Sequence, residues 1–226
     1  MRYLGGKSRI AKQLAAIVNA ARPPSWPVWD AFCGGLSMTR ALAAGGPVRS
    51  SDANRALISL YAAVAAGWDP PATVSEAEYR AARDLPDTDP QKAFAGFCAG
   101  FGGQYFGGYA RGEGRNWAAE GRRALLRDCP GRLFAHVDFL AVEPRRLDAV
   151  LYCDPPYRGT KSYPGAPAFD HDLFERRVHA WARWQPVFVS EYAFPLGQEV
   201  FSAPLRKRAT VGPGAMATER LFLISP

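Results

Sequence analysis

Stretches with apolar residues three or four positions apart alternate with short continuous apolar runs in the first part of the chain. Helical spacing covers residues 9–21, 36–44 and 53–66, and the short runs cover residues 27–32 and 48–52. Short apolar runs between helices are typical of buried strands, and Ser8 is the expected N-cap of the first helix. Two consecutive strand–helix units predict an α/β fold with a doubly wound, mostly parallel sheet.

The same alternation returns in the second half of the chain. Strands are expected at residues 135–140, 147–153 and 186–190, a helix at 170–184, and an antiparallel hairpin from 205–211 and 218–224 around a Gly-Pro-Gly turn at 212–214. A continuous apolar strand suits the middle of a parallel sheet, and the glycine-proline turn suits a terminal hairpin.

Residues 69–131 lack the alternation of strands and helices seen in the rest of the chain. Short helices are expected at residues 76–83 and 92–99, whereas the aromatic and glycine-rich run at 101–109 has neither a helical nor a strand period and is expected to be irregular. We therefore predict a sheet domain formed by residues 1–68 and 132–226, with a mainly helical and irregular insertion at 69–131.

Length and composition narrow the class of protein. The 226 residues, 48% of them apolar, suit one full domain plus an insertion. No apolar run approaches the roughly 18 residues of a membrane helix, and the first residues lack the apolar stretch of a secretory signal, so we expect a cytoplasmic protein without a membrane span. The net charge of +7 favours a polyanionic partner, although basic residues that only confer solubility remain an alternative.

Neither the cysteines nor the histidines form a motif. The cysteines show no Cys-x-x-Cys pair and no spacing suited to metal ligands, so we expect reduced core or loop thiols and no metal. We assign no role to the histidines. The residues concerned are Cys33, Cys98, Cys129, Cys153, His136, His171 and His179.

The strongest chemical motif is Asp-Pro-Pro-Tyr at residues 154–157, directly after an apolar strand. Open α/β sheets bind ligands at this end of their strands. The prolines stiffen the turn and remove N–H donors, so Asp154 and the Pro155 carbonyl are acceptors suited to an amine, and the Tyr157 ring offers a stacking face. A nucleobase with an exocyclic amino group fits both features. The alternative is a rigid turn in which Asp154 is a helix N-cap.

A glycine loop follows the first predicted strand. The run from Asp30 through Phe32 to Gly34 precedes the second helix, and Asp52 lies 18 residues after Gly34, where nucleotide-binding α/β proteins place the acid that binds a ribose. The third glycine of the dinucleotide motif and any phosphate-binding loop are missing, which disfavours nicotinamide cofactors and ATP. An ordinary strand-to-helix turn remains the alternative.

The N-terminal segment carries a weaker signal. Tyr3 precedes a glycine pair and Lys7, whose positive charge suits a carboxylate. A frayed chain end is the alternative interpretation.

These motifs, in this order, resemble the Dam-type DNA adenine-N6 methyltransferases, which use S-adenosylmethionine. The shared elements are the aromatic-x-Gly-Gly-Lys start, Phe-x-Gly-Gly, Asp-x-Asn after the second strand, an Asp-Phe pair and Asp-Pro-Pro-Tyr. The resemblance implies a Rossmann-like methyltransferase sheet. It also implies that the cofactor is bound by Tyr3, Lys7, Asp30, Phe32, Gly34, Asp52, Asp138, Phe139 and Asp154, with Asp52 on the ribose and Asp154 between cofactor and target base.

The resemblance further implies that residues 69–131 recognise double-stranded DNA. The residues expected to contact DNA are Tyr105, Tyr109, Arg111, Arg115, Arg122 and Arg123. We expect a monomer that needs no protein partner, in a bacterial or phage-infected cell. The biological setting stays open between restriction and modification, phage protection and regulation.

The expected reaction is direct methyl transfer to N6 of a flipped adenine, with Asp154, Pro155 and Tyr157 as catalytic residues. Two other classes stay open. Methyltransferases acting on cytosine N4 or on protein glutamine usually carry Ser or Asn at the position of Asp154, so the carboxylate favours adenine. A catalytically silent DNA-binding relative is the second alternative, and the intact motifs disfavour it.

Overall fold

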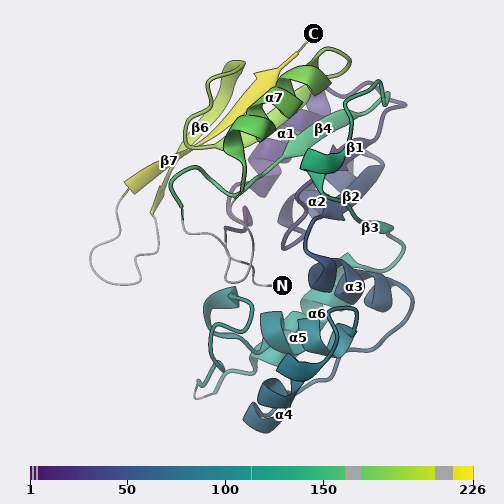
Figure 1. The fold of residues 1–226 in the computed structure, drawn as a ribbon, viewed down its shortest axis with the longest axis vertical. Coiled ribbons are helices and arrows are strands. Elements are labelled where there is room, and N and C mark those ends of the chain that lie inside the picture. Colours follow the sequence, from purple (N-terminus) through teal and green to yellow (C-terminus); the bar gives the residue numbers. More distant parts are fainter. Residues whose placement is uncertain (2, 4, 113, 161–168, 207–215, 226) are drawn as a thin grey trace. The chain divides into compact units, whose positions relative to one another are not determined.

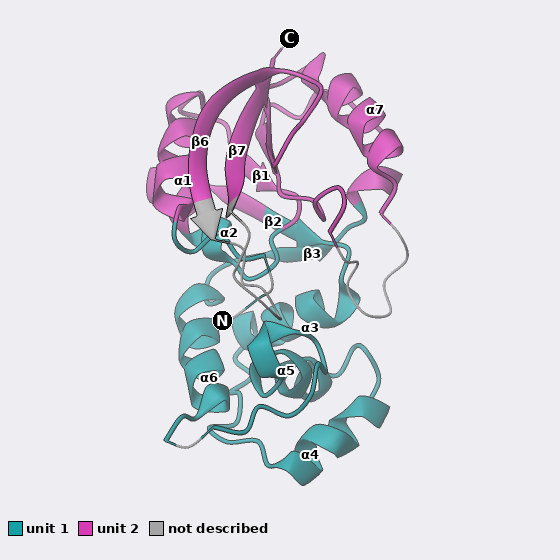
Figure 2. Ribbon diagram, turned by 90° about the vertical axis from the view of Figure 1, so that its left-hand side faces the viewer, with its two compact units in different colours: residues 1–9, 33–40, 50–138 teal, residues 10–32, 41–49, 139–226 magenta. Residues whose placement is uncertain are grey.

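The computed structural model describes residues 1–226 with the exception of 2, 4, 113, 161–168, 207–215 and 226. Contacts within the chain divide it into two compact units, which Figure 2 colours separately. Unit 1 comprises residues 1–9, 33–40 and 50–138, and unit 2 comprises residues 10–32, 41–49 and 139–226. The assignment of residues 69–131 to an inserted functional region stays a prediction.

Seven strands form a mixed sheet in the order β3-β2-β1-β4-β5-β7-β6. They are β1 (Val28–Asp30), β2 (Val48–Asp52), β3 (Phe134–His136), β4 (Val150–Cys153), β5 (Val187–Glu191), β6 (Gln198–Arg206) and β7 (Met216–Ile224). β4 is parallel to β1 and β5, and β2 is parallel to β3, whereas β7 is antiparallel to both β5 and β6. The predicted doubly wound, mostly parallel sheet with an antiparallel C-terminal hairpin is confirmed.

Two helices cover the strands of unit 2. Helices α1 (Ala11–Ala20) and α7 (His171–Ala182) lie on opposite sides of these strands (Figure 2). Asp170 caps α7 by accepting a hydrogen bond from the Leu173 N–H at 2.8 Å. The prediction that Ser8 caps the first helix is wrong, because Ile10 holds the N-cap position without a side-chain bond. The Ile10 side chain is buried, so packing rather than capping sets this helix start.

The helices of unit 1 are labelled in Figure 1, and they pack around two apolar clusters. They include α3 (Arg55–Ala65), α4 (Glu76–Ala81), α5 (Pro90–Cys98) and α6 (Trp117–Asp128), while α2 (Ser37–Leu42) follows the glycine loop and crosses the unit boundary. Short 3-10 segments are η1 (Ala43–Gly45), η2 (Ala82–Asp84), η3 (Phe101–Gly103) and η4 (Phe139–Ala141). Helix α5 packs against α3 and α6, and Tyr61, Phe94 and Leu125 are fully buried between them.

Several predicted boundaries are wrong. The strand expected at residues 135–140 ends at His136, and a 3-10 turn follows it. The first strand of the hairpin runs from Gln198 to Arg206 and pairs with β7 along its length, so it begins before the predicted 205–211. Pro204 obscured this strand, but β6 is an edge strand, where proline is tolerated. The predicted turn at 212–214 lies outside the described residues.

Candidate active site

The glycine loop after β1 has a strained backbone. Gly34 has φ of +40° and Leu36 has φ of +62°, a value that a leucine rarely adopts. The Tyr61 hydroxyl donates to the Gly34 carbonyl at 2.5 Å, and the Leu36 N–H donates to the Cys33 carbonyl at 2.8 Å. Such strain persists where the surroundings impose it, and it concentrates at functional loops.

Asp52, at the end of β2, holds this loop in place. One carboxylate oxygen accepts the Gly34 N–H at 3.0 Å, and the other accepts the Asn54 N–H at 2.9 Å. Burial raises the pKa of Asp52, while these two backbone hydrogen bonds oppose the rise. A carboxylate offers about four lone-pair directions, so two hydrogen bonds leave acceptor capacity for ribose hydroxyls.

The N-terminal segment packs on the same loop. A Cβ atom added to Gly35 would lie 2.6 Å from the Cβ of Tyr3, so only glycine allows this approach. The Tyr3 ring contacts Phe97, with 5.8 Å between ring centroids. Lys7 is buried, and its ammonium donates to the Gly5 carbonyl at 3.3 Å. The structure therefore brings Tyr3, the glycine loop and Asp52 together within unit 1.

The Asp-Pro-Pro-Tyr turn follows β4 in unit 2. Pro155 is buried, and Tyr157 is only 9% exposed. The Tyr157 hydroxyl donates a hydrogen bond to Glu219, and its ring meets that of Tyr192 edge-on, with 4.7 Å between ring centroids. Burial raises the pKa of Tyr157, and the neighbouring Asp154 carboxylate raises it further, so the phenol is a neutral donor. Because Asp170 caps α7, Asp154 is not the N-cap of that helix. A stacking role for Tyr157 stays a prediction.

Two acidic residues beside this turn were missed by the sequence analysis. Glu191 ends β5 and Glu219 lies on β7, and both are almost fully buried. Burial raises the pKa of Glu191 to about 7, and the charges of Asp154 and Glu219 contribute to that rise. For Glu191 the only sequence signal was its place at the end of an apolar strand, which does not reveal its distant partners.

Two predicted cofactor residues of unit 2 occupy core positions. Asp30 on β1 is fully buried, and Phe139 is 1% exposed. The Phe139 ring packs against Phe32 at 5.5 Å and against Trp29 at 5.7 Å between centroids. Their contacts with a cofactor stay predictions, as does that of Asp138, which is exposed on unit 1.

One family model matches the N-terminal part of the chain. Residues 3–94 match the model of the D12 class N6 adenine-specific DNA methyltransferases. This match confirms the resemblance seen in the motifs. The D12 match covers Tyr3, Lys7, Gly34 and Asp52, and it ends before the Asp-Pro-Pro-Tyr turn. No curated protein matches the chain.

Solved methyltransferase structures show low similarity to the chain. The rRNA methyltransferase AviRa from Streptomyces viridochromogenes is 14% identical, with 99% of this chain and 87% of that chain covered and a TM-score of 0.40. The glycopeptide N-methyltransferase MtfA, complexed with S-adenosyl-L-methionine, is 11% identical, with coverage of 98% and 75% and a TM-score of 0.34. The sugar N-methyltransferase KedS8 from Streptoalloteichus is also 11% identical, with coverage of 98% and 75% and a TM-score of 0.36.

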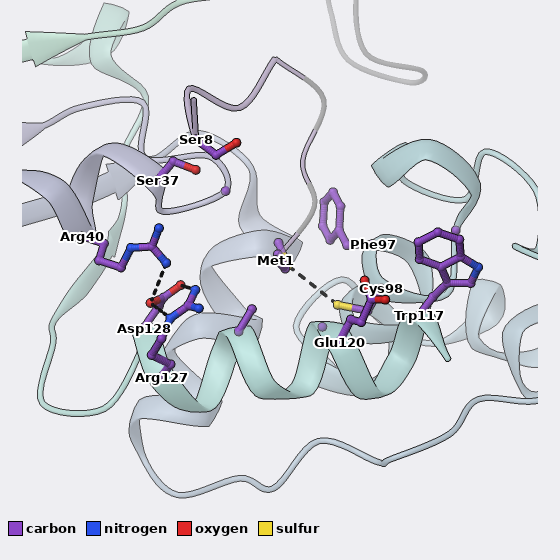
Figure 3. A pocket seen from close by; sticks show the side chains of 14 residues that line it. Met1, Ser8, Ser37, Arg40, Phe97, Cys98, Trp117, Glu120, Arg127 and Asp128 are labelled. Atoms are coloured by element: carbon purple, nitrogen blue, oxygen red, sulfur yellow. Dashed lines mark hydrogen bonds and ion pairs between the residues drawn. The ribbon is translucent and has the colours of Figure 1, made fainter. Parts of the chain in front are cut away.

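A pocket of about 320 Å³ lies within unit 1, beside the glycine loop and α6 (Figure 3). Gly35 and Ser37 line it from the loop, and Phe97 lines it from α5. At one end, Asp128 forms ion pairs with Arg40 at 3.7 Å and with Arg127 at 2.7 Å. None of the predicted cofactor residues lines this pocket, although Gly35 and Ser8 are direct neighbours of Gly34 and Lys7 in the chain.

Three of the four predicted DNA-binding arginines already bind carboxylates of unit 1. Ion pairs join Arg111 to Glu76 at 2.6 Å, Arg115 to Glu120 at 2.7 Å and Arg122 to Asp69 at 2.7 Å, whereas Arg123 is exposed. Exposed pairs of this kind are weak and screened by salt, so a phosphate can compete for these arginines. Their role in DNA binding stays a prediction.

The two predicted DNA-binding tyrosines pack within unit 1. The Tyr109 hydroxyl donates to the Val74 carbonyl at 2.8 Å. The Tyr105 ring packs against Phe97, with 4.5 Å between ring centroids. Burial raises the pKa of Tyr105 to about 12. The predicted irregular loop is thus closed onto α4 and α5, and Phe101, at 67% exposure, is its most exposed aromatic side chain in the described structure.

Three further observations apply to the described residues alone. No group of three or more His, Cys, Asp or Glu side chains among them could hold a metal ion. No helix in the described ranges is long and apolar enough to cross a membrane. All four cysteines are buried and free of disulfides, which agrees with the predicted reduced thiols.

Proposed function

We propose that this chain is a DNA adenine methyltransferase that transfers a methyl group from S-adenosylmethionine to the N6 amine of a flipped adenine. The observation that carries the proposal is the D12 family match at residues 3–94, followed by the Asp-Pro-Pro-Tyr turn at the carboxyl end of β4. The family supports an adenine substrate in DNA, and a carboxylate rather than a neutral side chain precedes the prolines.

The residues of unit 1 fit an adenosyl cofactor with a methionine tail. Asp52 retains acceptor capacity for ribose hydroxyls after its bonds to the loop, and Lys7 supplies a cation for a carboxylate. When bound, S-adenosylmethionine supplies an electrophilic methyl group. Asp30, Phe32, Asp138 and Phe139 are proposed to complete cofactor binding.

The residues of unit 2 supply acceptors for the target amine. The lone pair of an aromatic amine is delocalised into the ring, so hydrogen bonds from its N–H groups to Asp154 and to the Pro155 carbonyl favour the nucleophilic form. Burial raises the pKa of the Cys98 thiol to about 12 and that of Cys153 well above its ordinary value. These thiols are therefore not nucleophiles, and direct transfer to the amine needs none.

The test is to incubate the purified protein with labelled S-adenosylmethionine and plasmid DNA and to identify the methylated nucleoside after digestion. We expect the label in the deoxynucleoside of N6-methyladenine. Labelled N4-methylcytosine, label in protein instead of DNA, or no transfer despite cofactor binding would each favour one of the other classes over the proposal.

DNA affinity is expected to depend on the four arginines of the inserted region. Their combined replacement by alanine should weaken binding and reduce the slope of log affinity against log salt by about 0.9 for each phosphate that the variant no longer neutralises. The residues to replace are Arg111, Arg115, Arg122 and Arg123. Fluorescence anisotropy with duplex DNA at several salt concentrations measures both quantities.

A charge-matched control separates phosphate binding from net charge. It replaces four exposed arginines outside the inserted region, namely Arg49, Arg145, Arg176 and Arg183. We expect the control to keep a steeper salt slope than the first variant. Equal slopes in the two variants would place the DNA-binding surface elsewhere.

A further inference from the structure

Two buried carboxylates hold the Asp-Pro-Pro-Tyr turn from neighbouring strands of unit 2. Glu191, at the end of β5, accepts the backbone N–H of Arg158 at 3.0 Å, immediately after the turn. Glu219, on β7, accepts the hydroxyl of Tyr157, the last residue of the turn. Each bond joins residues far apart in sequence, so the turn depends on the sheet for its position.

Glu191 also ties the turn to its own strand. Its second oxygen accepts the Tyr192 N–H at 2.8 Å, so both carboxylate oxygens are bound to backbone donors. Glu191 is 4% exposed. Burying a carboxylate costs more free energy than burying a neutral apolar side chain. An ordinary strand end would therefore not require a buried carboxylate at this position.

The charged groups around Glu191 do not neutralise it. Asp154 and Glu219 raise its pKa by their charge, in addition to burial. Arg220, opposite Glu191 in the β5–β7 register, binds Glu199 and the Tyr192 carbonyl. Among the described residues, further charged or titratable groups near the turn are the Arg158 guanidinium, the two acids of α7 that bind it, Asp172 and Glu175, and His171 beside them.

We propose that Glu191 is a positioning residue for the methyl transfer, which in its ionised form holds the Asp-Pro-Pro-Tyr turn so that Asp154 accepts the hydrogen bond of the target amine. This inference rests on the proposed function. The ionised carboxylate makes stronger bonds to the two N–H groups than the acid does, and its negative charge strengthens Asp154 as an acceptor. Protonation of Glu191 weakens both effects. The raised pKa places this change near neutral pH.

The test compares wild type with Glu191→Gln in single-turnover methylation between pH 5.5 and pH 8.5. The amide is isosteric, but it has one acceptor oxygen and no charge. We expect the wild-type rate to rise with pH through a midpoint near 7, and the variant rate to be roughly tenfold or more lower at pH 8, without that rise. KM for DNA is expected to stay unchanged, because Glu191 acts through the turn.

Glu199→Gln is the matched control, since Glu199 lies on β6, is 44% exposed and pairs with Arg220. It should keep the wild-type rate and pH profile. Glu191→Asp keeps the negative charge, but its shorter side chain places the carboxylate farther from the Arg158 N–H. This variant should therefore keep the pH dependence and have a lower methylation rate. Glu191→Asp also takes the place of Glu191→Gln as the test variant if Glu191→Gln does not fold. A wild-type rate and pH profile in Glu191→Gln, or a wild-type rate in Glu191→Asp, would overturn the proposal.

A second readout does not depend on methylation. The backbone amide resonances of Arg158 and Tyr192 should titrate near pH 7 in the ligand-free wild type and in the Glu199→Gln control, but not in Glu191→Gln. Titration together with the kinetic result supports the positioning role. Resonances that do not titrate overturn it. A protein that binds cofactor and shows the titration but methylates no DNA contradicts the proposed function instead.

Discussion

Replacement of Asp154 by alanine is expected to reduce methyl transfer on the order of a hundredfold or more while the protein stays folded. Loss of a single preorganised hydrogen-bonding group at the reacting atoms has an effect of this size. The Asp-Pro-Pro-Tyr turn is also held by Glu191 and Glu219, through groups other than the Asp154 side chain, so we expect the alanine variant to keep its fold. Single-turnover methylation of plasmid DNA measures the rate, and thermal melting checks the fold.

Asp172→Ala is a suitable control for this variant. Asp172 is an exposed acid of the same unit, and it contacts Arg158, close to the turn. Its replacement changes the net charge equally, and the methylation rate should stay near that of wild type. Near wild-type turnover in Asp154→Ala would refute the catalytic assignment, and an equal loss in both variants would point to a general charge effect.

Removal of the Asp154 charge should also lower the pKa of Glu191. The Asp154 carboxylate is one of the groups that raise the pKa of Glu191, so the alanine variant should bring this pKa down. A buried acid with a raised pKa binds its proton more tightly in the folded state than in the unfolded state. Its contribution to stability is therefore present at low pH and is lost as pH rises through about 7. This loss should shift to lower pH in Asp154→Ala.

The sheet and the loops at its strand ends could be predicted because their signals are local. Each apolar run and each glycine pair lies within a few residues, so the strand–helix units of residues 27–66 and the strand before Asp154 follow from spacing alone. Strand ends were less predictable. Phe139 continues an apolar run in sequence, yet it belongs to a 3-10 turn whose ring packs against Phe32 and Trp29.

Helix α6 shows why one element was missed. Its exposed residues are arginine-rich, and a glycine, which disfavours helices, stands at position 121. A Cβ atom added to Gly121 would lie 2.5 Å from the Cys98 sulfur, so the glycine is required where α5 and α6 meet. The residue that weakens the helix signal in the sequence is thus the one that allows the helices to pack.

The support behind the Asp-Pro-Pro-Tyr turn could not be predicted for a different reason. Glu191 contacts a backbone N–H that lies 33 residues earlier, and Glu219 contacts a hydroxyl 62 residues earlier. Parallel and antiparallel pairing of β4, β5 and β7 creates these contacts. No spacing rule in a single sequence shows which acid at a strand end faces which turn.

Replacement of Asp52 by alanine should weaken cofactor binding roughly 10- to 150-fold and leave DNA binding nearly unchanged. A hydrogen bond to a charged group contributes roughly 1.5–3 kcal/mol, which corresponds to that range of affinity. Calorimetry with S-adenosylhomocysteine or sinefungin measures the affinity. Asp84→Ala, an exposed acid of unit 1, is the control and should bind as wild type does.

Asp52→Asn separates ribose binding from support of the loop. The Asp52 carboxylate accepts the N–H groups of both Gly34 and Asn54, and an asparagine can keep only one of these bonds. If loop support dominates, the asparagine variant should lose thermal stability along with affinity. If ribose binding dominates, affinity should fall in both variants while the melting temperature changes little in Asp52→Asn.

The pH dependence of cofactor affinity provides a further check on Asp52. Burial raises the pKa of this carboxyl, so it takes up a proton at a higher pH than an ordinary aspartate does. A protonated carboxyl is a weaker acceptor for ribose hydroxyls, so wild-type affinity should fall as pH falls through this raised pKa, and the fall should be absent in Asp52→Asn. Unchanged affinity in Asp52→Ala at every pH would show that the glycine loop and Asp52 do not form an adenosine site.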